Sequence, residues 1–322
     1  MKHHFADMLD RSAGLWSMVP NVERWSFHFE DVADAPEDST VLTLTKRDRN
    51  WERAHDLPGL EELTLHEPSR EQIALLQDLP RLKRLRISHA RPKSLGVLEG
   101  HSSLEELVLE YVSGFESLAP VGSLSSLRSL HMENLRRVRD FSGLLPGPSL
   151  RSLEIVGTLD WDQPIEDLDF LDGLPALEVF ALGWCRVLAE SPIFAGLCRA
   201  QSLKCVRFGW RTVRLEDYAY LEAMRPDVEG AIQEPFLLHE PREETISEDD
   251  IRTSMPAEEF LELTGARIDA DGRRSLMKPP SAWLLGRGRR DATGKLETIE
   301  RRCREHAELY RRLVDACRAD SR

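Results

Sequence analysis

The segment Gly286–Arg290 comes nearer than other parts of this sequence to a chemical motif. It reads Gly-Arg-Gly-Arg-Arg, so it combines a G-x-G spacing with the guanidinium groups of Arg287, Arg289 and Arg290. A loop that cradles a nucleotide phosphate needs the fuller G-x-G-x-x-G or G-x-x-x-x-G-K-[ST] pattern, and neither is present. Two interpretations stay open: contact with an acidic surface or nucleic-acid phosphate, and a solvated turn between a strand and a helix.

Other residue types with chemical potential lack the spacing that would assemble a site. Asp269, Asp271 and Gly272 have the D-x-D-G of a calcium loop without its third acidic ligand and distal Glu, so a hairpin turn explains them better. The histidines show no metal-ligand spacing, and Cys185 and Cys205 occupy structural positions. We predict no catalytic residues, no cofactor, no metal site and no enzymatic activity.

The larger pattern is a six-residue phrase, L-x-x-L-x-L, that recurs between Leu60 and Phe208 at spacings of 22 to 27 residues. Its seven copies start at Leu60, Leu82, Leu104, Leu127, Leu150, Leu177 and Leu203. We expect each copy to form a strand whose first, fourth and sixth residues point into one continuous core, with Leu107 and Leu130 buried near its middle.

This phrase and period resemble the leucine-rich repeat, in the short-period class of bacterial internalins and phosphatase regulators. The resemblance covers about residues 22–233. It implies an α/β solenoid, a horseshoe with a parallel concave sheet that binds other macromolecules. One departure concerns the ninth position, where the family usually has Asn, so we expect less regular convex turns. That position holds Pro68, Ala90, Val112, Leu135, Thr158, Cys185 and Arg211.

The sequence divides into four predicted regions: an N-terminal cap (1–37), the solenoid (38–233), an acidic linker with one short helix (234–255), and a small C-terminal α+β domain (256–322). Within the cap, we predict a helix over Phe5–Trp16 and a strand over Val22–Phe29. Within the last region, a short helix from Pro256, a hairpin around 270–272, a strand from Ser281 and a long final helix are expected.

The final helix carries an apolar seam at heptad spacing. Two interpretations remain: docking on the hairpin of its own domain, or a homodimer through the 295–317 helix. The seam residues are Leu296, Ile299, Cys303, His306, Tyr310, Leu313 and Cys317.

Composition limits the class of protein. Hydrophobic residues make up 41% of 322, and no run of 18 apolar residues or secretory signal is evident. An odd number of cysteines, five, without paired spacing favours reduced thiols and a cytoplasmic location. The net charge is −13, yet residues 265–322 hold 15 Lys/Arg and 9 Asp/Glu and so carry +6, which leaves −19 elsewhere. This contrast suggests two partner surfaces or contact between the two parts.

The predicted partner site lies on the concave face towards its C-terminal end. Trp184 and Trp210 follow consecutive strands beside Gly183 and Gly209, which leaves an open apolar shelf with Arg207 at its edge. The alternative is that both tryptophans pack under the long loop of the sixth repeat or under the C-terminal domain. Residues assigned to the site are Trp184, Trp210, Arg207, Tyr111, His131 and Glu154.

The second position of each phrase is assigned to register and solubility instead, because its charges mostly alternate in sign between neighbouring strands. This column is Glu61, Lys83, Glu105, Arg128, Arg151, Glu178 and Lys204. The leading hypothesis is a cytoplasmic, bacterial-type adaptor that binds, and inhibits or regulates, a protein partner. The alternatives are a nucleic-acid-associated protein that uses Arg287, Arg289 and Arg290, and an enzyme whose activity lies in 256–322.

Overall fold

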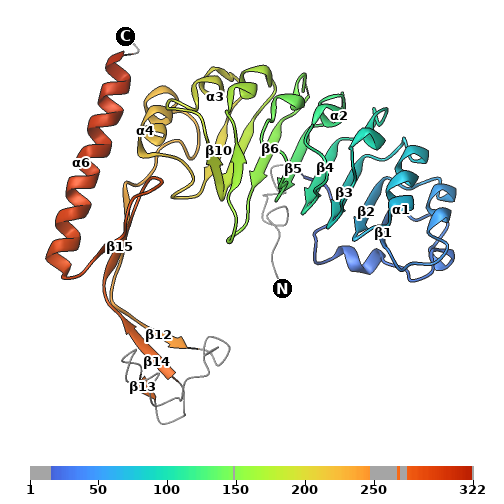
Figure 1. Ribbon diagram of the computed structural model, residues 1–322, viewed down its shortest axis with the longest axis horizontal. Coiled ribbons are helices and arrows are strands. Elements are labelled where there is room, and N and C mark those ends of the chain that lie inside the picture. The colour runs from blue at the N-terminus through green and yellow to red at the C-terminus, as the bar shows by residue number, and fades with distance from the viewer. Residues whose placement is uncertain (1–15, 148, 247–266, 269–273, 321–322) are drawn as a thin grey trace.

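The computed structural model of the chain describes residues 16–147, 149–246, 267–268 and 274–320. Its main feature is a curved, eight-stranded parallel sheet in which neighbours in space follow the order of the chain (Figure 1). The strands are β1 (Val41–Thr45), β2 (Glu62–His66), β3 (Arg84–Ser88), β4 (Glu106–Glu110), β5 (Ser129–Glu133), β6 (Ser152–Val156), β8 (Val179–Gly183) and β10 (Cys205–Phe208). The predicted leucine-rich-repeat solenoid is confirmed.

The register of this sheet follows from the repeat. Each leucine at the fourth position lies opposite the same position of the next strand, so Leu63, Leu85, Leu107 and Leu130 form one row. All four side chains are fully buried, as the sequence predicts for Leu107 and Leu130. A slip of one residue would turn this row towards solvent, which is why the register is strongly specified.

Short helices and 3-10 turns cover the convex side, and they differ from repeat to repeat. The helices are α1 (Arg70–Ala74), α2 (Ala119–Gly122), α3 (Ala195–Arg199) and α4 (Leu215–Met224). The 3-10 turns are η5 (Trp51–Asp56), η6 (Leu75–Asp78), η7 (Gly96–Leu98), η8 (Ser142–Leu144) and η9 (Asp169–Gly173).

The irregularity of the convex side is consistent with the ninth position of the repeat. Mostly apolar residues replace the usual Asn there, so no repeated side chain is available to bond the backbone of adjacent turns. Val112 and Leu135 at this position are buried in the core. Individual polar side chains satisfy the backbone in their place: the Gln72 amide donates to Thr45 O at 2.7 Å, and Gln163 donates to Val138 O at 2.8 Å and accepts from Leu135 N at 3.0 Å.

The N-terminal end differs from the prediction. The helix expected over Phe5–Trp16 falls almost entirely outside the described residues. The strand expected over Val22–Phe29 is wrong, because the chain forms the 3-10 turns η3 (Arg24–Phe27) and η4 (Val32–Asp34). The stretch contacts β1 through an isolated bridge from His28 to Thr43 and a hydrogen bond from the Thr43 hydroxyl to the carbonyl of Arg24. The alternating apolar residues misled the prediction, since Val22 and Trp25 are 52% and 43% exposed.

The linker expected over 234–255 is also wrong for residues 236–246, which form two strands, β11 (Phe236–His239) and β12 (Arg242–Ile246). They pair with strands from beyond the predicted linker, so their partners are distant in sequence. β11 pairs with β15 (Ser281–Leu284), which pairs with β16 (Ala292–Thr293). β12 pairs with β14 (Arg274–Lys278), which pairs with β13 (Arg267–Ile268).

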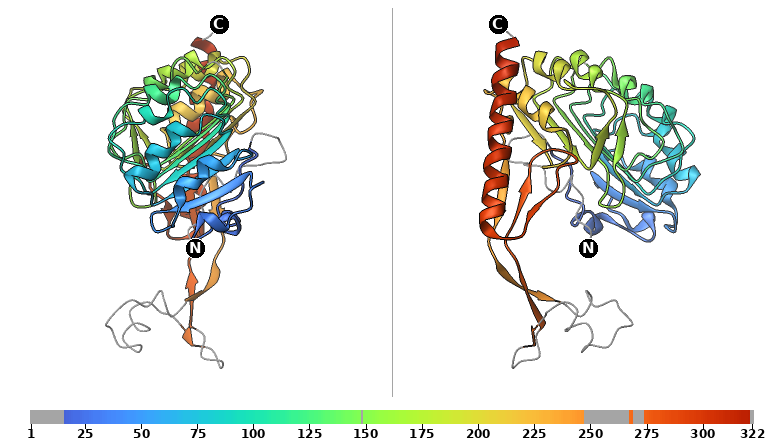
Figure 2. Two further views of the ribbon diagram at one scale, coloured as in Figure 1. Left: turned by 90° about the vertical axis from the view of Figure 1, so that its right-hand side faces the viewer. Right: turned by 60° about the vertical axis from the view of Figure 1, so that its left-hand side comes forward.

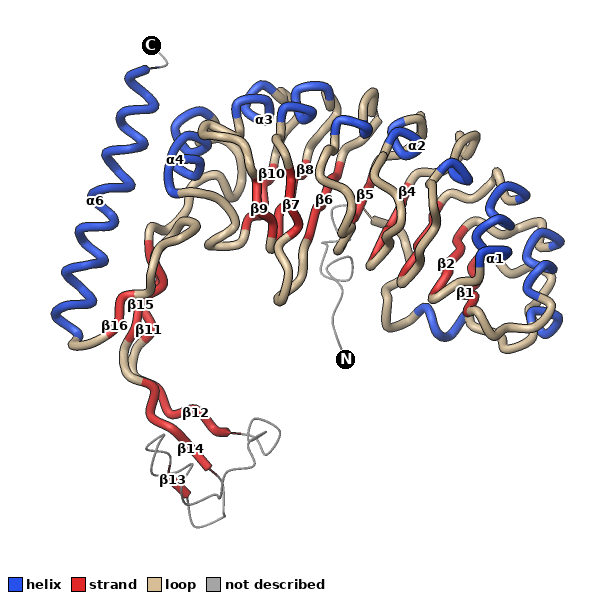
Figure 3. Tube along the Cα trace, in the orientation of Figure 1, coloured by secondary structure: helices blue, strands red, loops and turns tan. Residues whose placement is uncertain are grey.

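These strands make two small antiparallel sheets rather than one. The predicted strand at Ser281 is present, but it lies in a different sheet from the hairpin strands β13 and β14. The β12–β14–β13 sheet extends away from the solenoid (Figures 1 and 3). The short helix expected from Pro256 and the hairpin turn itself lie outside the described residues.

The long helix α6 (Leu296–Asp320) runs along the C-terminal end of the solenoid and packs against α4 (Figure 2). Tyr310 and Val314 on α6, together with Leu285, belong to the solenoid core. The Tyr310 hydroxyl donates to Glu222 of α4 at 2.8 Å, and His306 Nε2 lies 3.1 Å from the carbonyl of Leu285.

Most of the apolar seam of α6 is therefore covered by the same chain: Ile299, Cys303, His306 and Tyr310 are buried, whereas Leu296 is 49% exposed. The homodimer through the 295–317 helix stays a prediction. We expected α6 to dock on the other elements of its own domain. It does contact β15 and β16, and it also packs against α4 of the solenoid. The physical reason is the open end of a solenoid, whose last apolar face needs a cover. Val228 and Ala231, which lie after the seventh copy of the phrase where an eighth would fall, are small and buried.

Candidate functional site

The concave face of the sheet carries the third, fifth, seventh and eighth positions of each repeat, and its two halves differ in chemistry. Over β2–β5 these positions bring buried charged and polar side chains together. Over β8 and β10 the same positions are small, apolar or aromatic, except for Arg207 at the fifth position of β10. The buried polar residues of the early half are Glu62, Arg86, Glu106, Glu110, Ser129, His131 and Glu133.

At the late end, the concave face forms a cavity of about 960 Å³ between the last repeats and the β11–β15–β16 sheet. Trp184 and Trp210 come from the turns that follow β8 and β10, and Trp283 comes from β15. Trp184 is 38% exposed and Trp283 is 44% exposed, so both present apolar surface to solvent. The wall also includes Glu154, Asp162, Ala181, Leu182, Cys185, Val206, Arg207, Phe208, Arg211, Gln233 and Arg287.

The backbone places these aromatic side chains at the strand ends. Trp184 has a φ of 47°, in the left-handed region, like His89 and Tyr111 at the same position of earlier repeats. This conformation turns the chain sharply at the end of each strand. Trp283 stands on β15 between the buried Ala282 and Leu284, so the two-residue alternation of a strand turns it outwards.

Ion pairs hold the second wall of the cavity against the solenoid. Arg287 pairs with Asp162, in the long loop of the sixth repeat, and donates to the carbonyl of Cys185 at 2.8 Å. Backbone contacts continue this junction, since Gly286 N donates to Trp210 O at 2.9 Å. The loop of the sixth repeat thus contacts the C-terminal region. The strand β7 (Gln163–Ile165) of this loop pairs with β9 (Cys185–Val187).

Of the six predicted site residues, the structure brings Trp184, Trp210, Arg207 and Glu154 into this cavity. Arg207 is exposed, whereas Glu154 is buried and lies 3.2 Å from Nδ1 of His131. The tryptophans neither stand on an open shelf nor pack beneath the C-terminal region. Instead, that region forms an opposite wall and leaves a space between.

Tyr111 and His131 do not line the cavity. Tyr111 stacks on His89 with ring centroids 4.8 Å apart, and its burial, together with the Glu133 carboxylate, raises its pKa to about 12. His131 is fully buried. Burial opposes its protonation, but the hydrogen bond and charge of Glu154, with other nearby carboxylates, outweigh that cost and raise its pKa.

Sequence reasoning missed Trp283, Asp162 and Arg287 as lining residues. Trp283 had a signal, because the run Ser281–Leu285 was predicted as a strand and its alternation separates Trp283 from its buried neighbours. The pairing of Arg287 with Asp162 joins residues 125 apart in the chain, and no local pattern predicts such a contact.

Two of the three arginines considered for nucleic-acid contact have acidic partners within the chain. Arg287 pairs with Asp162, and Arg289 lies 3.7 Å from Glu216 of α4. Arg290 accepts a hydrogen bond from Arg302 only through its backbone carbonyl, and its side chain is exposed. The basic tail and the acidic solenoid therefore meet, which was one of the two interpretations of the charge contrast.

Among the residues that the structure describes, no group of three or more His, Cys, Asp or Glu is arranged to hold a metal ion. All five cysteines are free thiols. Burial raises the pKa of Cys185, which lines the cavity, and raises that of Cys198 to about 11, so neither is an activated thiolate. Within the described part of the chain, no helix is long and apolar enough to cross a membrane.

Comparisons with known proteins give matches among solved structures only. No protein-family model and no curated protein matches the chain. An internalin C2 from Listeria monocytogenes is 20% identical with a TM-score of 0.40, over 52% of this chain and 70% of that one. An internalin F from the same organism is 19% identical with a TM-score of 0.38, over 68% of this chain and 65% of that one.

A leucine-rich-repeat protein from Leptospira interrogans is 12% identical with a TM-score of 0.33, over 67% of this chain and 63% of that one. The chain thus spans between 63% and 70% of the length of these three proteins. The fold of this chain rests on the repeat register and the parallel sheet described above.

Proposed function

We propose that this leucine-rich-repeat protein is a non-enzymatic interaction scaffold that binds a protein partner in the cavity between its last repeats and its C-terminal sheet. The observation that carries this proposal is the cavity itself, in which Trp184, Trp210 and Trp283 converge from two different sheets. Partly exposed tryptophans in a concave, apolar site are the residues that most often supply binding energy at protein interfaces.

The cavity also indicates the chemistry of the partner. About 960 Å³ is enough to enclose one or two large apolar side chains. Arg207 is exposed at its wall, so an acidic group beside those side chains would find a cationic anchor. We therefore expect the partner to present an aromatic or long aliphatic residue next to an Asp, a Glu or a carboxyl terminus.

The test is affinity capture from cells that naturally produce the protein, followed by binding measurements with the partner obtained. Trp184→Ala and Trp210→Ala should each weaken binding at least tenfold, as expected for hot-spot residues. Trp25→Ala is the matched control, because Trp25 is also exposed but lies at the opposite end of the solenoid. Folded Trp184→Ala and Trp210→Ala variants that bind as tightly as the parent would overturn the proposal.

Several finer features belong to the same proposal. A cytoplasmic location of the adaptor is supported by five unpaired cysteines, since thiols persist in reducing compartments. The bacterial type is supported by the short repeat period, 22 to 23 residues between the first five copies of the phrase. Binding in a concave cavity would also block the surface that the partner presents, which is a direct route to inhibition or regulation. The nucleic-acid alternative predicts binding that falls steeply with salt and a partner that nuclease removes. Protein binding at the tryptophans predicts neither.

A further inference from the structure

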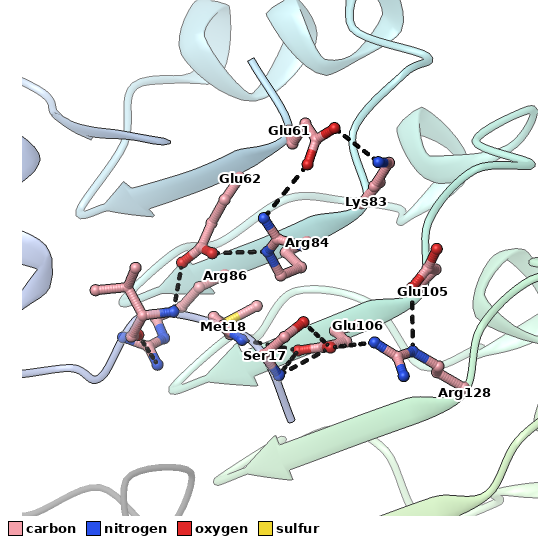
Figure 4. Close-up of polar contacts among 11 residues, drawn as sticks. Ser17, Met18, Glu61, Glu62, Lys83, Arg84, Arg86, Glu105, Glu106 and Arg128 are labelled. Atoms are coloured by element: carbon pink, nitrogen blue, oxygen red, sulfur yellow. Dashed lines mark hydrogen bonds and ion pairs between the residues drawn. The ribbon is translucent and has the colours of Figure 1, made fainter. Parts of the chain in front are cut away.

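The early half of the concave face is not open, because a segment of the chain's own N-terminal region lies across it. Residues Trp16–Val19 contact β4 first and β2 next, so the segment runs against the order of the repeats (Figure 4). The path continues towards β1, where the carbonyl of Arg24 accepts a hydrogen bond from Thr43 at 2.9 Å. The strands thus lie beneath a segment of irregular backbone that bends at Met18.

Glu106 of β4 is the centre of this contact. The backbone N–H of Ser17 donates to both of its carboxylate oxygens at 2.9 Å, and that of Met18 donates at 3.0 Å. The Ser17 hydroxyl lies 2.5 Å from Oε1. Arg128 approaches the same carboxylate at 2.9 Å, and Glu106 is completely buried. A buried carboxylate is costly unless hydrogen bonds satisfy it, and here the peptide supplies most of them.

Glu62 and Arg86 form the second anchor, two residues further along the segment. The N–H of Val19 donates to Glu62 at 2.8 Å, and the carbonyl of Val19 accepts from Arg86 at 3.4 Å. The next anchored residue is Asn21, whose side-chain oxygen accepts from Arg86 at 3.2 Å. Burial raises the pKa of Glu62 even though Val19 and Arg84 favour its charged form. The site therefore contains buried carboxylate oxygens that accept hydrogen bonds from the backbone N–H groups of a peptide.

The apolar part of the contact is small and separate from the solenoid core. Trp16 and Met18, two residues apart, pack on Val108 of β4 and form a cluster of their own. The segment contributes nothing else to the repeat core, which is continuous without it. Hence the apolar contacts of the segment are separate from those that join the repeats to one another.

We propose that this half of the concave face is a second peptide-binding site, between Glu62 and Glu106, whose resident ligand is the chain's own Trp16–Val19 segment. Its recognition acts mainly through backbone N–H groups, one small hydroxyl and a methionine-sized apolar side chain. The partner it fits is accordingly a peptide segment with those same features, which displaces the resident segment. This site is separate from the tryptophan cavity.

The tether makes the resident segment a strong competitor. A covalently linked ligand acts at an effective concentration near the millimolar range, so a free peptide of equal affinity competes poorly. The test must therefore weaken the resident segment while leaving the site intact. Ser17→Pro does this, because proline has no N–H to donate to Glu106 and lacks the hydroxyl.

The experiment measures binding of a fluorescent synthetic peptide of residues 16–23 to the full chain by anisotropy. We expect Ser17→Pro to bind it at least tenfold more tightly than the unaltered protein. Adding Glu106→Gln to Ser17→Pro should abolish that gain. Glu105→Gln is the matched control, because Glu105 precedes the same strand but belongs to the second-position column, and it should retain the gain.

Equal binding by Ser17→Pro and the unaltered protein would overturn the proposal, as would undiminished binding after Glu106→Gln. A second measurement needs no variant. In ¹⁵N-labelled protein, the amides of Ser17, Met18 and Val19 should lose protection from hydrogen exchange when unlabelled peptide is added in excess. Protection that persists in roughly 10 mM peptide, well above the effective concentration of the tether, would show a permanent structural strap and not a ligand.

Discussion

The two halves of the concave face share one backbone and differ in what their outward positions carry. At the third position, Glu62 and Glu106 in the early repeats correspond to Val179 and Cys205 in the late ones. At the eighth position, Tyr111 corresponds to Trp184. The strands pair in the same register throughout. The comparison shows that the leucines determine the register of the strands, whereas the side chains on the concave face can differ in chemistry from one repeat to the next.

The halves also differ in how the rest of the chain covers them. A segment from the N-terminal region lies directly on the early half and satisfies its buried carboxylates. The C-terminal sheet stands opposite the late half, joined to it through Arg287 and Asp162, and leaves a cavity. The buried carboxylates Glu62 and Glu106 therefore lie where a peptide backbone is present, whereas Trp184 and Trp210 lie where space remains.

The largest expected effect tests what the halves share. Leu107→Ala, in the early half, and Leu182→Ala, in the late half, should each lower the free energy of unfolding by about 2–5 kcal/mol, because both side chains are buried in one core. Urea unfolding measures the loss. Glu105→Ala is the control, with a loss below about 1 kcal/mol. A loss below about 0.5 kcal/mol for either leucine would show that this side chain does not stabilise the shared core, and that the two halves are not built alike.

The solenoid was predictable because its information is local and repeated. Each phrase sets the inward face of its own strand, so Leu107 and Leu130 could be placed without knowledge of the rest of the chain. The same logic placed Trp184 and Trp210 on the concave face, since they occupy one position of consecutive repeats. The outward orientation of Trp283 could also have been predicted, because side chains alternate between the two faces of its strand.

The covering segments were not predictable, because their contacts join distant residues without periodicity. Ser17 meets Glu106 across 89 positions, and nothing in the sequence around Ser17 marks it as a ligand. The acid-rich run at Arg242–Ile246 became a strand because its partner, β14, lies about thirty residues later. A charged composition favoured a linker, and long-range pairing overrode it.

A smaller effect tests the boundary between the halves, where His131 of β5 meets Glu154 of β6. Burial opposes the charged imidazole, but Glu154, Glu110 and Glu133 raise its pKa above 6.5. A raised pKa gives stability that is complete below pH 6.5 and lost as pH rises through the folded-state pKa. His131→Gln should therefore cost about 1–3 kcal/mol at pH 6 and less at pH 9.

Urea unfolding across this pH range measures the difference. Leu107→Ala provides the comparison, because the loss of an apolar side chain should not depend on pH. If the cost of His131→Gln is equal at pH 6 and pH 9, the imidazole is neutral in the folded protein. The boundary would then rest on packing and a neutral hydrogen bond.

The smallest effect concerns the second-position column, which we predict to serve register and solubility rather than partner binding. Glu178 pairs with Arg151 at 2.7 Å and Lys204 at 2.8 Å, and the hydrogen bond from Arg151 is the main reason that its pKa falls to about 2. A lowered pKa gives stability that is present above about pH 4.5 and lost as pH falls towards 2. Because both cationic partners are largely exposed, Glu178→Gln should cost only about 0.2–1 kcal/mol at pH 7.

Thermal unfolding at pH 7 and pH 2.5 checks this dependence, with the difference between Glu178→Gln and the parent shrinking at the lower pH. The same column should leave both ligands untouched, so Glu105→Lys should not alter binding at the tryptophan cavity. A loss of partner binding by Glu105→Lys without a loss of stability would contradict the assignment. In that case the interface would extend past the concave columns, and the contrast between the two halves would no longer describe all of the binding surface.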